Sequence, residues 1–226
     1  MALAISPSFS SGIRTPKCTV SVPCRRPVYF FLDYSNIAIS AQEIAWVQDG
    51  FTSEHRVRLH ARNLRALAER NREWKQGFAA AGLRAGCPKM CKHFDDAGIR
   101  IEVSERGSSS NREQNVDQRI QCEMLQLTKS SHQRGTVVLA TGDGAAGSRN
   151  EGFQNVLEIL LEHDYSIELF SWRRTLNQVL RGWVERHGRY IELDDFYSDI
   201  TFIDGGRQAT ETHILNRKIA KKGLVS

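Results

Sequence analysis

The sequence predicts a three-layer α/β fold, in which helices cover both faces of a central, mainly parallel sheet. Short apolar runs, typical of buried strands, alternate along the chain with longer segments whose apolar residues recur at helical spacing. Strands that alternate with helices form parallel β-α-β units. The chain has 226 residues, of which 40% are hydrophobic, and this suffices for one large globular domain.

The predicted strands are compact runs of apolar or alternating residues. Residues 28–32 and 136–140 are almost entirely apolar, as in strands that are buried on both faces of a parallel sheet. Shorter or more polar strands are expected at 99–103, 166–171 and 189–193, with an edge segment at 196–203.

Helices are expected where apolar residues share one side of a helical wheel. These segments are residues 54–76, 113–129, 153–163 and 176–187. Gly82 to Met90 is predicted to be a loop. We interpret residues 37–98 as a helical insertion within a domain that spans residues 27–204.

Both ends of the chain are predicted to lie outside this domain. The first 26 residues are rich in Ser and Pro and contain no Asp or Glu, a composition shared by disordered tails and organellar transit peptides. Both interpretations stand. Residues 205–226 are expected to form a loosely ordered basic tail.

The composition limits the compartments and the partners that we expect for this protein. No stretch approaches the roughly 20 apolar residues that cross a bilayer, so a membrane protein is excluded. Five cysteines in no regular framework favour reduced thiols and an intracellular location, cytoplasmic or nuclear, with organelle import open. The net charge of +5 favours a polyanion such as nucleic acid. The sequence leaves a homo-oligomer open without indicating one.

Three aspartates are predicted to meet at one edge of the sheet. Asp33 directly follows the strand at 28–32, and Asp143 follows the strand at 136–140. Ligand crevices in such sheets lie beyond the carboxyl ends of the strands, so both acids should face the same crevice. Asp117 lies in the first turns of a predicted helix, next to its sheet-facing side. Three carboxylates repel one another unless a cation compensates, and such oxygen ligands select Mg²⁺ or Mn²⁺.

The segments around these aspartates resemble the NYN family of PIN-like ribonucleases. Phe31-Leu-Asp-Tyr-Ser-Asn36 is similar to the opening motif of that family. Asn115-Val-Asp117 and Leu139-Ala-Thr-Gly-Asp143 are similar to two later motifs. The resemblance implies a PIN-like fold and an acidic cluster that binds divalent metal and cuts RNA. It assigns metal binding and catalysis to Asp33, Asp117 and Asp143, with Asn36 as the supporting polar residue.

One position departs from the pattern of the family. Many members carry a further Asp two residues after the Gly-Asp aspartate, where this chain has Ala145. Glu151, expected at the start of the next helix, is the nearest substitute and is predicted as the fourth metal ligand. The alternative interpretation is an acid that stabilises the dipole of that helix.

The resemblance implies a mechanism in which bound Mg²⁺ or Mn²⁺ activates a water for in-line attack on single-stranded RNA. Arginines that flank the crevice are expected to pair with phosphates, and aromatic rings, Trp172 among them, to stack on bases. The predicted RNA contacts are Arg112, Arg149, Arg173, Arg174 and Tyr34.

Three other functions can be compared with this pattern. An NYN domain that is catalytically weak and only binds RNA fits the same residues, because Ala145 removes one acid. A haloacid dehalogenase-like phosphatase is disfavoured, because Ser35 stands where its second acid is needed. A dinucleotide-binding oxidoreductase is excluded, because the first strand lacks a glycine-rich turn after it.

Overall fold

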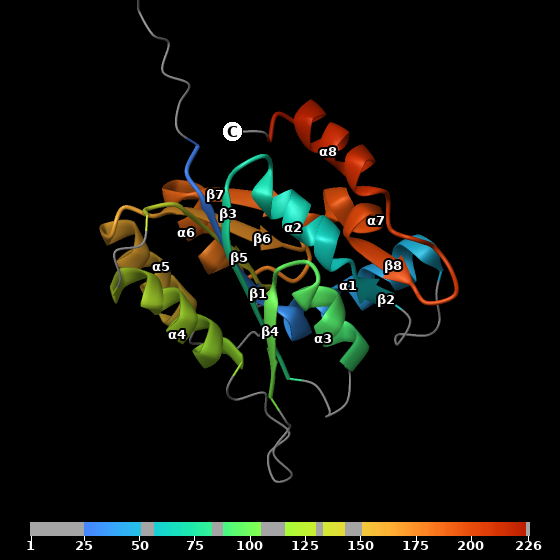
Figure 1. Cartoon of the computed structure of the whole chain (residues 1–226), viewed down its shortest axis with the longest axis horizontal. Helices are drawn as coiled ribbons and strands as arrows, with labels where there is room; N and C mark the ends of the chain where they lie inside the picture. Colours follow the sequence, from blue (N-terminus) through green and yellow to red (C-terminus); the bar gives the residue numbers. More distant parts are fainter. Residues whose placement is uncertain are drawn as a thin grey trace, which may run out of the picture.

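The computed structural model describes residues 25–50, 57–82, 88–104, 116–129, 133–142 and 151–224. A six-stranded sheet with helices on both faces forms its centre (Figure 1). The strands of this sheet are β1 (Val28–Asp33), β3 (Trp74–Ala81), β4 (Arg100–Val103), β5 (Thr136–Ala140), β6 (Ser166–Ser171) and β7 (Arg189–Glu192). The predicted three-layer α/β/α architecture is confirmed.

The order of the strands defines where a ligand crevice lies. The order is β4-β3-β1-β5-β6-β7, and all neighbours in it are parallel. The chain proceeds outward from β1 to β4, then crosses to β5 on the other side of β1 and proceeds outward again. In open α/β sheets, the point where this direction reverses leaves a crevice at the carboxyl ends of the two central strands. That point lies between β1, which ends at Asp33, and β5.

Both faces of β1 are covered, which explains why the strand is apolar almost throughout. Successive side chains point to opposite faces, so Phe30 packs in one core and Phe31 in the other. The helices on the Phe30 side are α1 (Tyr34–Asp49), α2 (Ala61–Glu69), α3 (Pro88–Asp95), α7 (Tyr197–Ile200) and α8 (Thr212–Lys221). The helices on the Phe31 side are α4 (Val116–Lys129), α5 (Glu151–Glu162) and α6 (Gln178–His187) (Figure 1).

The prediction of a helix at residues 54–76 is wrong over much of that range. Its described part comprises β2 (Val57–Leu59), α2 and the start of β3. Strand β2 pairs antiparallel with β8 (Thr201–Ile203), a partner that lies far away in the sequence. Strand β3 lies inside the sheet between β1 and β4. The stretch 37–98 therefore contributes a central strand and is not a helical insertion.

The C-terminal segment is also more ordered than the sequence suggests. Residues 205–226 were expected to be a loose tail, but they include α8, which packs on α2. Leu215 and Ile219, one turn apart, are buried by this contact. Asn63 of α2 fixes the connection, because its side chain donates to the carbonyl oxygens of Asp199 and Thr210 at 2.7 Å each. Two other expectations change: the predicted loop 82–90 includes the start of α3, and the segment 196–203 contains α7 before β8.

Two histidines cap the start of α2. His60 Nδ1 accepts a hydrogen bond from the backbone N–H of Asn63 at 3.2 Å, and His93 Nε2 accepts one from Ala61 at 3.1 Å. A ring nitrogen accepts only when it carries no proton, so both imidazoles cap the helix in their neutral form. Burial lowers the pKa of both histidines; the neighbouring His93 lowers that of His60 further, and Arg62 lowers both.

We expect this pair to make stability depend on pH. Unfolded histidines titrate near pH ~6.5. Because the folded pKa values are lowered, their stabilising effect is complete above that pH and is lost as the unfolded chain takes up protons below it. The free energy of unfolding in urea should therefore fall more between pH 7 and pH 5 for the wild type than for His60→Asn, in which asparagine caps without titrating. Equal losses in both proteins would contradict the role of His60.

Candidate functional site

Asp33 connects β1 to α1 at the reversal point of the sheet. Asp33 is buried, with 5% of the residue exposed. Oδ1 accepts a hydrogen bond from the backbone N–H of Asn36 at 3.1 Å, which makes Asp33 the N-cap of α1. Thr141, directly after β5, donates to Oδ2 at the long distance of 3.5 Å. A buried carboxylate thus lies at the positive end of a helix and beside the end of the neighbouring strand.

The loops after β5 and β6 approach the first turn of α1 closely. A Cβ atom at Gly142 would lie 2.3 Å from Asn36 Oδ1 and 2.9 Å from Thr175 Oγ1. Only a residue without a side chain therefore fits between them. The Thr175 hydroxyl is buried and has no hydrogen-bond partner within the described parts of the chain. Side-chain oxygen atoms from three segments consequently gather at the first turn of α1, which Asp33 caps.

We expect Gly142→Ala to disturb this arrangement. The new methyl group must displace the side chain of Asn36, and overpacking of this kind costs about 1–3 kcal/mol. Gly182 provides a matched control, because a Cβ there meets nothing nearer than an Arg186 side-chain atom at 3.7 Å. Urea unfolding should show a loss for Gly142→Ala and none for Gly182→Ala. Equal stability of the two variants would show that the contact at Gly142 is unimportant.

Helices α4 and α5 begin at the same end of the sheet. A helix that joins parallel strands starts near the carboxyl end of the first one, so α4 begins at the edge where Asp33 lies. Asp117 is in the first turn of α4, partly exposed and next to the buried Val116. The start of α5 packs against α4, since a Cβ at Gly152 would lie 2.6 Å from Gln121 Nε2. The backbone of Glu151, the first residue of α5, therefore lies near the first turns of α4.

Several predicted site residues lie outside the residues that the structure describes. Asp143, Arg112 and Arg149 lie in undescribed segments, and only the backbone of Glu151 is described. Within the described ranges, no group of three or more His, Cys, Asp or Glu side chains is arranged to hold a metal ion. The metal cluster of Asp33, Asp117, Asp143 and Glu151 stays a prediction.

Two aromatic residues that were expected to stack on RNA bases are core residues. Tyr34 is 5% exposed, and its ring meets Phe94 edge to face at 5.4 Å between centroids. Trp172 is fully buried, and its indole N–H donates to the carbonyl oxygen of Ile37 at 3.0 Å. Both side chains belong to the core on the Phe30 side of the sheet. The prediction of base stacking is therefore corrected for both rings.

The two arginines after β6 differ in their surroundings. Arg173 forms an ion pair with Glu192, and its backbone N–H donates to Asp194 at 2.7 Å. Arg174 is exposed and has no ion pair with any residue that the structure describes. It lines a hollow of about 450 Å³ together with residues on the outer side of α1, which are Ile39, Gln42, Glu43, Trp46 and Val47.

Trp46 was missed by the sequence analysis. Its side chain is 64% exposed, beside Ile39 at 50% and Val47 at 76%. The available signal was a helix with apolar residues on all sides: Ile37 and Ile44 are buried, while these three residues face outward. The hollow begins about one turn after Asn36 on α1. Its arginine, which has no ion pair among the described residues, directly precedes Thr175.

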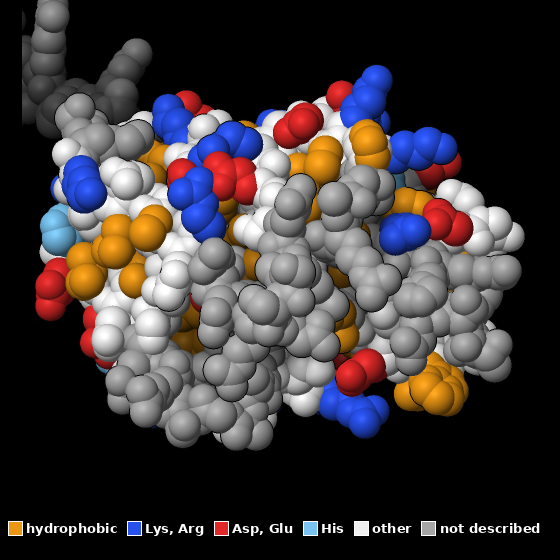
Figure 2. Space-filling view, turned by 90° about the horizontal axis from the view of Figure 1, so that it is seen from below, with side chains coloured by type: hydrophobic (Ala, Val, Ile, Leu, Met, Phe, Trp, Pro, Cys, Tyr) orange, Lys and Arg blue, Asp and Glu red, His pale blue; other side chains and the backbone are white. Residues whose placement is uncertain are grey.

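Charges of both signs are interspersed around this end of the sheet. In Figure 1, β1, β3 and β4 end toward the bottom, and Figure 2 shows the molecule from that side. Among the side chains drawn in colour, Lys and Arg lie next to Asp and Glu, and hydrophobic side chains are exposed at both margins. The described residues therefore offer individual basic contacts at this end, not a continuous basic surface.

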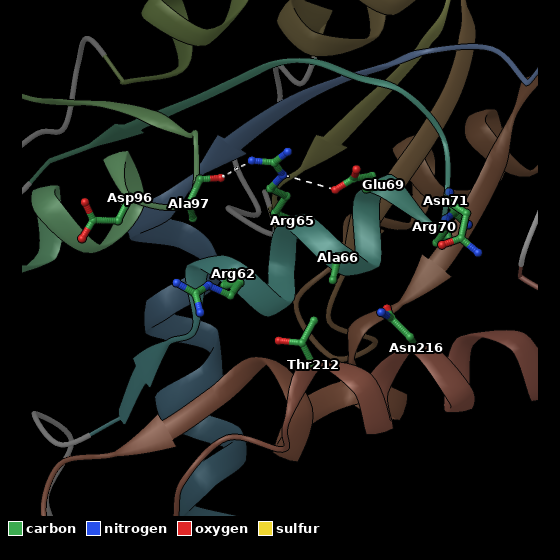
Figure 3. Close-up of a pocket in the computed structure, with 10 residues that line it drawn as sticks. All are labelled: Arg62, Arg65, Ala66, Glu69, Arg70, Asn71, Asp96, Ala97, Thr212 and Asn216. Carbon is green, nitrogen blue, oxygen red and sulfur yellow. Dashed lines mark hydrogen bonds and ion pairs between the residues drawn. The ribbon is translucent and has the colours of Figure 1, made fainter.

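A separate hollow of about 300 Å³ lies between α2, α3 and α8 (Figure 3). Its central arginine, Arg65, points toward Glu69 and the carbonyl oxygen of Ala97, at 3.2 and 3.0 Å. These contacts lie within the helical layer on the Phe30 side of the sheet. The hollow does not belong to the crevice at Asp33.

Comparison with known proteins supports the fold and leaves the function open. Neither a protein-family model nor a curated protein sequence matches the chain. A solved structure, a protein of unknown function from Vibrio parahaemolyticus, is similar with a TM-score of 0.55 and 15% identity, covering 76% of this chain and 96% of that one. At this identity, the likeness shows a shared fold alone. Within the described residues, no helix is long and apolar enough to span a bilayer.

Proposed function

We propose that this protein is a metal-dependent ribonuclease that cuts single-stranded RNA in the crevice at Asp33. The position of Asp33 carries the proposal: its carboxylate is buried at the reversal point of a parallel sheet, where α/β proteins bind their ligands. The resemblance of its surroundings to the NYN motifs supplies the reaction class, and the fold is compatible with that class.

The groups around Asp33 fit a hard divalent cation. The carboxylate of Asp33, the amide oxygen of Asn36 and the hydroxyl of Thr141 are oxygen donors, which Mg²⁺ and Mn²⁺ prefer. In the proposal, Asp117, Asp143 and Glu151 complete the set. Bound metal would lower the pKa of a water and neutralise charge on the phosphate. Asn36, confined by Gly142, would orient a ligand or a bound water.

Incubation with single-stranded RNA tests the proposal. We expect cleavage with Mn²⁺, none with EDTA, and a strong loss in Asp117→Asn and Asp143→Asn. RNA that is bound but left intact would contradict the ribonuclease and favour a binding module. Cleavage that persists in both variants would contradict the assignment of the site.

Arg174 and Trp46 are proposed to hold the RNA next to the crevice. Stacking of a base on an aromatic ring contributes about 1–3 kcal/mol, so Trp46→Ala should weaken binding of a short single-stranded RNA at least about fivefold. Fluorescence anisotropy of labelled RNA in EDTA measures this without cleavage. Val179→Ala, which truncates another exposed apolar side chain (70% exposed), is the control. Equal affinities of both variants would remove Trp46 from the RNA surface.

A further inference from the structure

A hollow of about 640 Å³ opens at the end of the sheet opposite Asp33, where β5, β6 and β7 begin. Four arginines from three parts of the chain line it: Arg25 and Arg26 before β1, Arg72 before β3, and Arg189 at the start of β7. Six residues of a strand span about 20 Å, so this hollow is well separated from the crevice at Asp33.

Positive charge dominates the lining of this amino-terminal hollow. The four arginines face two carboxylates, those of Asp164 and Glu168. Glu168 is shared, because the buried Arg70 binds it together with Arg72. Because Arg70 and Arg72 already neutralise the single negative charge of Glu168, this charge does not balance the arginines at the mouth of the hollow.

Two of the arginines have no carboxylate partner among the described residues. Arg26 pairs with Asp164 at 3.1 Å, and all three guanidinium nitrogens of Arg72 donate to Glu168 or to backbone carbonyl oxygens. Within the described part of the chain, Arg25 makes one long hydrogen bond, to the carbonyl oxygen of Asn71 at 3.3 Å. Arg189 is exposed and forms no ion pair with a described residue. Both leave most of their N–H donors to a ligand.

A buried charge adds to the positive potential at this site. The side chain of Arg70 is fully buried beside Glu168, and its Nε and Nη1 atoms have no hydrogen-bond partner within the described ranges. Charges act more strongly through the protein interior than through water. Concave surfaces lined by one sign of charge concentrate ligands of the opposite sign.

We propose that the amino-terminal hollow binds phosphate groups, with Arg25 and Arg189 as the residues that contact the ligand. Guanidinium groups match phosphate oxygens through two parallel hydrogen bonds. Two sources supply this chemistry: a free oligophosphate such as that of a nucleotide, and the backbone of an RNA chain. The site is separate from the proposed ribonuclease centre and does not depend on its activity.

Binding in EDTA, where the proposed cleavage cannot occur, tests the inference. The probes are inorganic tripolyphosphate, measured by calorimetry, and a short labelled single-stranded RNA, measured by anisotropy. We expect Arg25→Gln and Arg189→Gln each to weaken binding of a probe about five- to tenfold. Each should also reduce the salt dependence of RNA binding by about one phosphate contact. Arg217→Gln is the matched control, because Arg217 is exposed on α8 without an ion pair to a described residue.

The two probes separate the sources of phosphate. Losses with both probes establish a site for free oligophosphate that RNA also uses. Losses with RNA alone establish a contact with the RNA backbone. The inference is overturned if neither probe distinguishes the two variants from Arg217→Gln, because net charge alone then explains binding. A protein that fails to cut RNA but shows these losses would contradict the ribonuclease and leave this site intact.

Discussion

Replacing Glu168 with alanine is expected to lower the free energy of unfolding by about 3–5 kcal/mol, since removing one partner of a buried ion pair leaves an uncompensated charge. Glu168 lies in β6 with its side chain only 8% exposed, and it binds Arg70 and Arg72, which are 0% and 3% exposed. One substitution therefore leaves two buried guanidinium groups without their counter-charge.

Arg70 depends on Glu168 to keep its charge in the interior. Burial lowers the pKa of Arg70 to about 10 although Glu168 raises it, so removing Glu168 increases the cost of holding this buried side chain in its charged form. Arg70 has little freedom to turn away, because it ends α2 in a left-handed conformation with φ of 44° and its guanidinium lies over the ring of Phe170. The loss should appear as a midpoint of thermal unfolding that is lower by roughly 6–20 °C.

Glu185→Ala provides the comparison for this effect. Glu185 pairs with Arg181 at 2.9 Å on α6, where the two side chains are 49% and 33% exposed. Exposed pairs of this spacing contribute about 0.3–0.5 kcal/mol. Urea unfolding should therefore separate the two glutamate substitutions clearly. If Glu168→Ala were as stable as Glu185→Ala, the buried cluster would be better solvated than its burial indicates.

Strands that are buried on both faces could be predicted from local sequence. The bounds expected for 136–140 and 166–171 are those of β5 and β6. In both cases, the apolar run begins after a residue that interrupts regular structure: Gly135 before β5, and Asp164, with φ of 60°, before β6. The pattern was sufficient here because β5 is apolar from Val137 to Ala140, and β6 keeps Ile167, Leu169 and Phe170 as apolar residues although Glu168 is also buried.

Strand β3 could not be predicted in this way. Its second half reads Gly77-Phe-Ala-Ala-Ala81, and alanine favours helices. The small side chains suit a different requirement, since this part of β3 is buried on both faces between α1 and α4. At Gly77, a Cβ would lie 2.5 Å from the Trp74 ring. Close packing across the sheet, which no local pattern reveals, decides the structure here.

The same limit applies to the candidate site. Asp33 could be predicted, because a polar residue directly after a buried strand must emerge at the edge of the sheet. The burial of Tyr34 could not, because the direction of the first turn of α1 depends on α3, whose Phe94 receives the ring. The outward position of Trp46 could not be predicted either, because it depends on which side of α1 packs against the sheet.

Asp33→Asn is expected to reduce RNA cleavage strongly while leaving the fold intact. Asparagine has nearly the same shape and keeps an Oδ1 atom to accept the hydrogen bond from the backbone of Asn36, and it is among the preferred N-cap residues. It removes the negative charge that the proposed metal site requires. A metal contributes several kcal/mol to the transition state, so kcat/KM should fall by about 10²- to 10⁴-fold.

A second substitution at this position separates the two roles of Asp33. Asp33→Ala loses the cap as well as the charge, so it should lose activity equally and also about 0.5–2 kcal/mol of stability. Affinity for RNA in EDTA should change little in either variant. If Asp33→Asn cleaved RNA like the wild type, Asp33 would serve only to begin α1, and any metal-dependent cleavage would have to be sought away from the reversal point of the sheet.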